Sequence, residues 1–531
     1  MHFHMKNIAK KTSILLLSGF LAVASTSCDD FLDLSPLDTR TEDNFYKTQS
    51  DAMEGLVGVY DVLQWNTLSG FHPTPMITDI MSDDAYSAGQ PSSEPNLLQM
   101  DRHNILTTNG EVFGLWRKHY IGIARANTLL QRIEGIDAPE DFKTRLIAEA
   151  KFLRAHFYLD LVRLFENVPL ILAPQAPSEY NQPQATPKAV YDQIALDLTE
   201  AMEDLPESTL RQSQGRVTKW AAKALLARAY LFYKGVYNQE LQAGGTSVTA
   251  QVALQHVNDI ISESGHDLLP NYADNFKRAN EFSIESVWEI SYSDENPWWD
   301  WGYVQGGEGN TQPQQQGPRI KNTAIENYLA GWSTATPTQE LYDAFEANDP
   351  RRDATILAET ELVGGKDNLN IGYQHTGYFS QKYTTAKEYA PSGGQLELNW
   401  GNNYRSIRFS DVLLMAAELR LMTGSGDAQA PLTRVRARVG LGPVPATLDN
   451  VYKERRVELA LEGHRYWDLL RRGLNVADDA ISVTYTTLPD NFEGAVSDFN
   501  IQFNTARKGF LPIPQSEIDL SAGTLKPNTG Y

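Results

Sequence analysis

The sequence of 531 residues contains a single cysteine, Cys28, and lacks the short motifs that mark common catalytic centres. One thiol cannot form an internal disulfide bond or the cysteine pair of a zinc site. The chain also has no His-Glu-x-x-His, no Gly-x-Ser-x-Gly and no phosphate-binding loop. No local pattern therefore indicates an enzyme, and no cofactor is expected.

Positive charge is scarce as well. The 46 Lys and Arg residues face 67 Asp and Glu residues, which gives a formal net charge of −21. A surface of this sign repels nucleic acid and anionic lipid, but it does not repel neutral sugars. We therefore expect no nucleic-acid partner. Because 41% of the residues are hydrophobic, the chain can still bury a large core.

Long hydrophobic runs are absent except at residues 14–23, and this run is shorter than the ~20 residues that a membrane-spanning helix needs. Three lysines precede it, and the small residues 24–27 follow it. The pattern predicts a secretory signal over residues 1–27, with Met1 or Met5 as the true start.

Cys28 directly follows the small residues, and this arrangement looks like the processing site of a bacterial lipoprotein. In such proteins the thiol is lipidated and becomes the first residue of the mature chain. Several acyl chains anchor a protein firmly, whereas one chain binds a membrane only marginally. The acidic residues Asp29 and Asp30 resemble the export signal that places lipoproteins on the cell surface in the Bacteroidetes.

Most of the mature chain has helical periodicity. In residues 149–170, the side chains of Phe152, Ala155, Leu159 and Val162 fall on one face of a helix. A small alanine among aromatic residues is typical of stacked helix pairs of the tetratricopeptide type. The same style predicts further helices at 50–64, 111–134, 188–204, 215–235, 249–262, 404–421, 432–440 and 451–473.

Other regions break this pattern. Residues 65–108 and 382–403 are rich in turn signals and are predicted to be loops. Residues 285–292 alternate like a short strand, and residues 337–353 predict a capped helix that ends in a turn. The final residues 506–531 are rich in proline and predict an irregular tail, which must pack on the body to be ordered.

Several segments resemble, in the right order, the signature segments of the SusD/RagB-like nutrient-binding lipoproteins. They are CDDFLDLSP at 28–36, EAKFLRAHFYLDLVRLFENVPL at 149–170, RFSDVLLMAAEL at 408–419, ERRVELALEGHRYWDLLRRG at 454–473, KGFLPIPQSEIDL at 508–520 and LKPNTGY at 525–531. The resemblance covers essentially the whole mature chain.

The resemblance implies a mostly α fold of four tetratricopeptide-like helix pairs, with a loop-rich region and a few short strands. After the signal, residues 28–531 would form one SusD-like domain. Its helical scaffold would comprise residues 44–265 and 404–475, its ligand-face insert residues 266–403, and its irregular tail residues 476–531. The family also implies a lipid anchor in the cell outer membrane, exposure to the outside, and a SusC-like TonB-dependent transporter as partner.

Four aromatic residues in the loop after the predicted strand are the main candidates for ligand binding: Trp298, Trp299, Trp301 and Tyr303. The apolar faces of sugar rings pack on flat aromatic rings, while nearby polar groups bind the hydroxyls. The alternative is that these rings fill the junction between strand and helices, or contact the transporter.

The resemblance adds weaker ligand-binding candidates in the first hundred or so residues, namely Trp65, Asp83, Tyr86 and Asn109. Asp83 and Asp84, with Asp79 nearby, could hold calcium through oxygen ligands. The twelve-residue pattern of known calcium loops is absent, however, so we expect a solvated acidic loop.

The sequence therefore predicts a surface-exposed lipoprotein that captures an oligosaccharide or polysaccharide and delivers it to its transporter without catalysis. Two alternatives stay open. One is a glycoside hydrolase, because two of the many carboxylates could meet in space. The other is a peptide-binding member of the same family.

Overall fold

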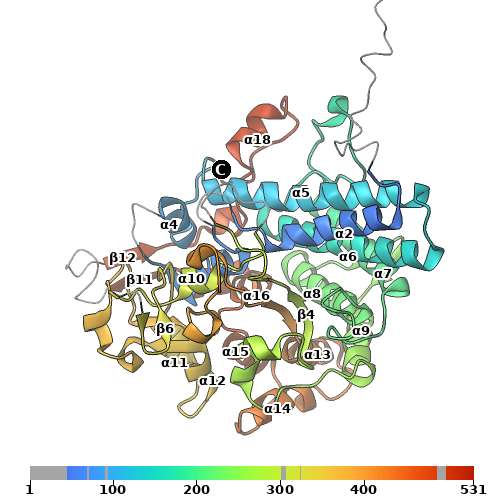
Figure 1. The fold of residues 1–531 in the computed structure, drawn as a ribbon. Helices are drawn as coiled ribbons and strands as arrows, with labels where there is room; N and C mark the ends of the chain where they lie inside the picture. The colour runs from blue at the N-terminus through green and yellow to red at the C-terminus, as the bar shows by residue number, and fades with distance from the viewer. Residues whose placement is uncertain (1–44, 68–70, 90–93, 300–306, 323, 487–497) are drawn as a thin grey trace, which may run out of the picture.

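The computed structural model describes residues 45–531 except 68–70, 90–93, 300–306, 323 and 487–497 (Figure 1). The predicted signal peptide, Cys28, Trp301 and Tyr303 lie outside the described residues. Helices make up most of the fold, and all described strands are short. The prediction of a mostly α protein is confirmed.

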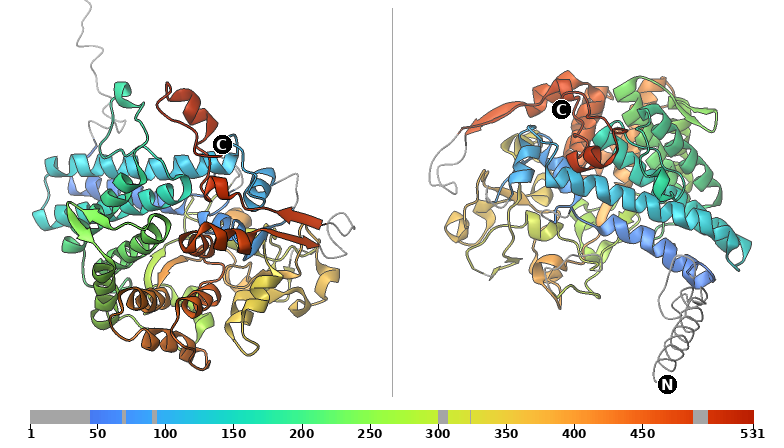
Figure 2. Two further views of the ribbon diagram at one scale, coloured as in Figure 1. Left: turned by 180° about the vertical axis from the view of Figure 1, so that it is seen from behind. Right: turned by 90° about the horizontal axis from the view of Figure 1, so that it is seen from above.

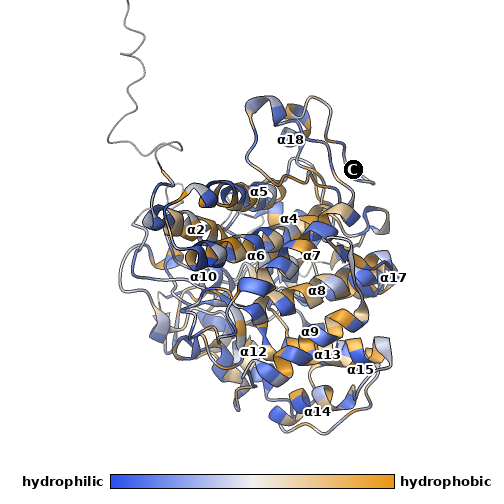
Figure 3. Ribbon diagram, turned by 90° about the vertical axis from the view of Figure 1, so that its right-hand side faces the viewer, coloured by the Kyte–Doolittle hydropathy of each residue, from blue (hydrophilic) through white to orange (hydrophobic). Residues whose placement is uncertain are grey.

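The longer helices follow one another in a stack and pack as successive pairs: α2 with α5, α6 with α7, α8 with α9, and α13 with α14 (Figure 3). α5 and α2 lie side by side along one edge of the molecule (Figure 2). The helices are α2 (Gln49–Gln64), α5 (Gly110–Arg132), α6 (Glu140–Phe165), α7 (Pro187–Asp204), α8 (Lys219–Tyr237), α9 (Ala250–Glu263), α13 (Phe409–Thr423), α14 (Gln429–Arg438), α15 (Leu448–Glu458), α16 (Arg465–Arg472) and α17 (Leu474–Ile481).

Helix α6 is covered by neighbours on several sides, as its broad apolar surface predicts. Phe152, Ala155 and Leu159 are fully buried. α5 crosses it closely at Gly122, where a Cβ atom would overlap the ring of Phe157. The close approach of the two helices therefore requires a residue without a side chain at this point.

The strands form antiparallel pairs, not a continuous sheet: β1 with β7, β2 with β3, β4 with β10, β5 with β6, β8 with β9, and β11 with β12. They are β1 (Ala85–Ser87), β2 (Leu241–Ala243), β3 (Thr246–Val248), β4 (Ser286–Ile290), β5 (Ala324–Ile325), β6 (Tyr328–Leu329), β7 (Ala335–Pro337), β8 (Ile356–Ala358), β9 (Tyr378–Ser380), β10 (Tyr404–Arg408), β11 (Val483–Thr486) and β12 (Asp498–Ile501). The β4–β10 pair joins the two ends of the predicted insert.

The prediction of a loop over residues 65–108 is wrong in part. This region contains α3 (Thr74–Ile80), β1 and α4 (Pro95–Asp101). Both helices begin with proline in their first turn, where the missing N–H costs nothing. They are too short to show helical periodicity, and burial of side chains such as Met76 and Leu97 stabilises them.

The remaining short helices are α10 (Gln312–Gln316), α11 (Gln339–Ala344), α12 (Arg351–Thr355) and α18 (Gln515–Leu520). The predicted helix at 337–353 is thus two short helices separated by a turn. Thr338 caps the first by accepting a hydrogen bond from the Leu341 amide at 3.1 Å.

The C-terminal residues pack on the helical body, as predicted. The Leu511 amide donates to the Leu164 carbonyl at 2.7 Å, and the Asn528 side chain donates to the Phe165 carbonyl at 2.6 Å. They are not wholly irregular, because they include α17, the β11–β12 hairpin and α18. Within the described part of the chain, no helix combines the length and the apolar character needed to cross a membrane.

Candidate functional site

The loop after β4 is held in place by the segment that precedes β10. The Trp298 amide donates to the Asn399 side-chain oxygen at 2.8 Å, and the Asn399 side-chain nitrogen donates back to the Trp298 carbonyl at 2.9 Å. The Gln395 amide donates to the same carbonyl at 2.7 Å. Because the two segments flank the paired strands β4 and β10, the antiparallel pairing brings them face to face.

The two described tryptophans of this loop differ sharply. The Trp298 ring is half-buried and lies over Gly307, where a Cβ atom would overlap the indole nitrogen. The Trp299 side chain is 72% exposed, and among the tryptophans that the structure describes it is the only exposed one. Trp298 thus fills the loop, whereas Trp299 offers its ring to solvent.

Trp65 lies just beyond the end of α2 and close to the start of the same loop. The neighbouring Gln64 side chain donates to the Ser291 carbonyl at 2.8 Å. Trp65 is half-buried; its indole N–H donates to Asp61 at 3.1 Å, and the Arg125 guanidinium lies 4.8 Å from its ring centre. The structure therefore brings Trp65 to the first residues of the loop that carries Trp298 and Trp299.

Asp83 is engaged within the protein. Its carboxylate accepts two hydrogen bonds from Arg465, at 2.7 and 2.8 Å, and lies 2.9 Å from Arg456. Burial opposes ionisation, but the two guanidinium groups lower the pKa of Asp83 below its ordinary value. Asp84 is fully buried and pairs with Arg456 at 2.8 Å.

The expectation of a solvated acidic loop at residues 79–84 is therefore wrong. These carboxylates anchor the end of α3 to α15 and α16, which lie more than 370 residues further along the chain. Within the described residues, no group of three or more His, Cys, Asp or Glu side chains could hold a metal ion.

Tyr86 and Asn109 also make contacts within the fold. The Tyr86 ring is 5% exposed and stacks on Tyr485, with 4.1 Å between ring centres and 4° between planes. Asn109 is the N-cap of α5; its side-chain oxygen accepts from the Glu111 amide at 2.9 Å and its nitrogen donates to the Asn96 carbonyl at 2.9 Å. An asparagine just before a helical pattern is a capping signal, so the sequence contained the evidence for this role.

The residues that position Trp299 were not among the predicted site residues. Gln395 donates its side-chain N–H to the Trp299 carbonyl at 3.0 Å, and Asn399 holds Trp298. Both lie about a hundred residues after the aromatic loop, in a segment that was predicted only to be a loop. No local signal in the sequence links the two segments.

Two family models match most of the chain. The SusD family matches residues 284–531, and the family described as "Starch-binding associating with outer membrane" matches residues 30–231. A SusD-like protein of Bacteroides ovatus is 26% identical over 87% of this chain and 83% of its own length. A SusD-like protein of Formosa agariphila is 25% identical over 98% of this chain and 100% of its own length.

Solved structures with the same fold include two that are described by their glycans. A laminarin-binding SusD-like protein is 34% identical, with a TM-score of 0.79 over 92% of this chain and 100% of that chain. Surface glycan-binding protein A of Bacteroides thetaiotaomicron, solved in complex with laminarihexaose, is 31% identical, with a TM-score of 0.78 over 91% of this chain and 100% of that chain. Both the helical scaffold and the loop-rich region thus have counterparts in these structures, and the chain belongs to the SusD/RagB-like family.

Proposed function

We propose that the protein binds a neutral oligosaccharide on the face that carries Trp299 and hands it unchanged to a TonB-dependent transporter. One observation carries the proposal: a tryptophan ring that is 72% exposed sits on a loop whose backbone is clamped at the neighbouring residue. A large aromatic ring held rigidly in solvent loses little conformational entropy when a ligand packs on it.

The charges around this loop favour a neutral ligand. Asp294 is paired with Arg278, and the guanidinium lowers the pKa of the Asp294 carboxyl. In the described part of the chain, Glu295 and Glu308 have no cation at ion-pair distance. Glu295 and Glu308 flank Trp299 in sequence, and their negative charge would repel a sulfated or carboxylated polysaccharide.

Laminarin-type glucans are the glycans we propose. Two relatives at 34% and 31% identity are described as binding laminarin or as complexed with laminarihexaose. The role of Trp301 and Tyr303 on the same loop, and of Trp65 at its base, stays a prediction.

Calorimetric titration of the mature protein with laminarihexaose tests the proposal. Stacking on an aromatic ring contributes about 0.5 to 1.5 kcal/mol beyond area burial, so Trp299→Ala should weaken binding several-fold to about tenfold. Tyr180→Ala is the matched control, because Tyr180 is also an exposed aromatic residue but lies before α7, outside this loop. Undiminished affinity in Trp299→Ala would remove this ring from the site and direct attention to Trp65.

Binding without catalysis is part of the proposal. The relatives are described as binding proteins, which supports it. Incubation of the protein with laminarihexaose should produce no new reducing ends. Their appearance would instead favour the glycoside hydrolase alternative, and calorimetric heat with unmodified peptides would favour the peptide-binding one.

A further inference from the structure

A partly open cavity of about 70 Å³ is lined by Trp65 and by residues of α5, α6, α8 and α16. A second cavity of about 20 Å³ shares four of its lining residues, namely Arg163, Arg228, His464 and Trp467. The larger one has less than half the ~150 Å³ that accommodates a benzene ring in a protein core, so it is too small for a sugar ring. It is not an extension of the proposed glycan site.

Positive charge exceeds negative charge around these cavities. Four of the cations form ion pairs: Arg163 with Asp160, Arg228 with Asp411, Arg455 with Asp411 and Asp468, and Arg471 with Asp468 and Glu418. The four carboxylates balance these four guanidinium groups. Lys118 is then a fifth cation, and no carboxylate within the described residues lies at ion-pair distance from it.

Two of the histidines that line the larger cavity, His156 and His464, add no charge to this balance at neutral pH. Burial lowers the pKa of His156 to about 4 and that of His464 to about 3, so both are neutral. Neutral imidazoles can each donate one N–H to the cavity without adding charge.

Lys118 is held at the cavity wall by one hydrogen bond, from its ammonium group to the Leu63 carbonyl at 3.2 Å near the end of α2. Burial lowers the pKa of Lys118 to about 8, against the opposing effect of Asp160, so the group is charged at pH 7. An ammonium group has three N–H donors. The partial negative charge of the helix end offsets only part of its full charge.

Two further donors face no acceptor. The Nε atoms of Arg163 and Arg228 are buried, and neither has a hydrogen-bond partner within the described residues. Both side chains line both cavities. Buried N–H groups without acceptors are uncommon in folded proteins, and a bound ion or an ordered water can account for such a group.

We infer that this cavity binds one small monovalent anion, such as chloride or formate, facing Lys118, Arg163 and Arg228. An anion would accept hydrogen bonds from the unpaired donors and would also compensate the excess positive charge. The volume also admits water, at ~30 Å³ per molecule, but water would leave the positive charge uncompensated. Because Lys118 contacts the end of α2 next to Trp65, the anion would tie α2 to α5, α6 and α8. The inference does not depend on the proposed glycan.

Two measurements on the mature protein test the inference. Crystals soaked in sodium bromide should show an anomalous peak in the cavity, because bromide replaces chloride. At equal ionic strength, the melting temperature should be on the order of 2 °C higher in chloride or formate than in gluconate, which is too large to enter. Lys118→Met should abolish both the peak and the difference, whereas Lys453→Met, at an exposed lysine on α15, should keep both.

Absence of a bromide peak from the wild-type cavity would overturn the inference, as would equal melting temperatures in chloride and gluconate. A peak that persists at full height in Lys118→Met would also overturn it. If Lys118→Met fails to fold, the two measurements on the wild-type protein decide by themselves.

Discussion

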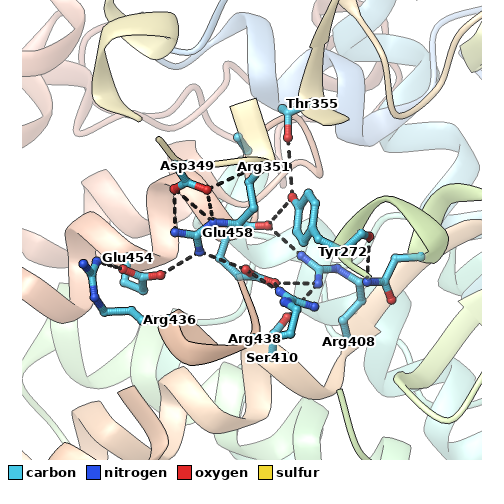
Figure 4. Close-up of polar contacts among 12 residues, drawn as sticks. Tyr272, Asp349, Arg351, Thr355, Arg408, Ser410, Arg436, Arg438, Glu454 and Glu458 are labelled. Carbon is cyan, nitrogen blue, oxygen red and sulfur yellow. Dashed lines mark hydrogen bonds and ion pairs between the residues drawn. The ribbon is translucent and has the colours of Figure 1, made fainter. Parts of the chain in front are cut away.

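Arg408, the last residue of β10, donates one hydrogen bond to the main-chain carbonyl of Glu458 at 2.7 Å and another to its carboxylate at 2.8 Å (Figure 4). Both side chains are fully buried. Glu458 ends α15 and also accepts hydrogen bonds from Arg351 and Arg438. The Glu458 carboxylate therefore links β10, α12 and α14 to α15. These elements lie far from Trp299 in the sequence.

Replacing Arg408 should destabilise the protein strongly. In Arg408→Met, Glu458 loses one of its cations and the buried Glu462 loses its guanidinium partner. Removing one partner of a buried ion pair costs about 3 to 5 kcal/mol, whereas an exposed pair contributes about 0 to 1 kcal/mol. Denaturant unfolding should show this loss, and the control Arg434→Met, which breaks an exposed pair with Asp267, should stay close to wild type. Equal stability of the two variants would contradict the prediction.

Because of the protonation state of His72, the free energy of unfolding should decrease at alkaline pH. Burial opposes its protonation, but Glu111 and Glu94, each 3.1 Å away, raise the pKa of His72 from 6.5 to about 10. The folded state then holds a proton that the unfolded state has lost, so this contribution is complete below pH 6.5 and disappears as the pH rises through about 10.

The stability difference between wild type and His72→Gln should accordingly shrink by about 2 kcal/mol between pH 7.5 and pH 9.5. Denaturant unfolding at the two pH values measures it. His256→Gln is the control, because burial lowers the pKa of His256 to about 4 and keeps it neutral in both buffers. A constant difference for His72→Gln would show that the imidazole is not protonated in the folded state.

Overpacking at Ala155 should lower the melting temperature. Ala155 is fully buried on α6, where Leu would force shifts of the neighbouring helices that cost about 1 to 3 kcal/mol. Ala430→Leu on α14 is the control, since Ala430 is exposed. A scan by calorimetry should separate the two variants, and an unchanged melt for Ala155→Leu would be incompatible with this packing.

Truncation of Trp298 should lower the free energy of unfolding, whereas truncation of Trp299 should leave it nearly unchanged. Trp298→Ala removes a half-buried ring from above Gly307 and should cost about 2 kcal/mol of stability, less than the 3 to 5 kcal/mol of a fully buried tryptophan. Trp299→Ala should leave the free energy of unfolding within about 0.5 kcal/mol of wild type. Denaturant unfolding of both variants compares them directly, and a larger loss for Trp299→Ala would reverse the two roles.

The anchoring prediction concerns Cys28. If the predicted lipidation of this thiol takes place, wild-type protein expressed in its native host should partition with membranes through the attached acyl chains. Cys28→Ala should be recovered in the soluble fraction or as an unprocessed precursor, while Ser27, which is not lipidated, should tolerate Ser27→Ala. Unchanged membrane association of Cys28→Ala would refute the lipid anchor.

The sequence by itself determined most of the helical scaffold. Two predictions were wrong in part: residues 404–408 form β10 instead of the start of a helix, and the helix predicted over 451–473 is split into α15 and α16. Helical periodicity is a local property, because residues three and four positions apart share a face whatever the rest of the chain does. The ends of α2, α7 and α9 fall within one or two residues of their predicted positions. The caps at Thr186 and Thr249 come from the same local chemistry. The short helices α3 and α4 escaped prediction because tertiary burial, not periodicity, stabilises them.

Only the tertiary structure decided which candidate residues are free to meet a ligand. Trp298 and Trp299 are adjacent and chemically identical. Their different exposure depends on Asn399, which lies about a hundred residues later, and on Gly307 of the same loop. Asp83 is likewise occupied by Arg465, a partner 382 residues away. A sequence lists the side chains that can bind, but long-range packing determines which of them are already bound within the fold, because each pairing depends on the positions of both partners in space.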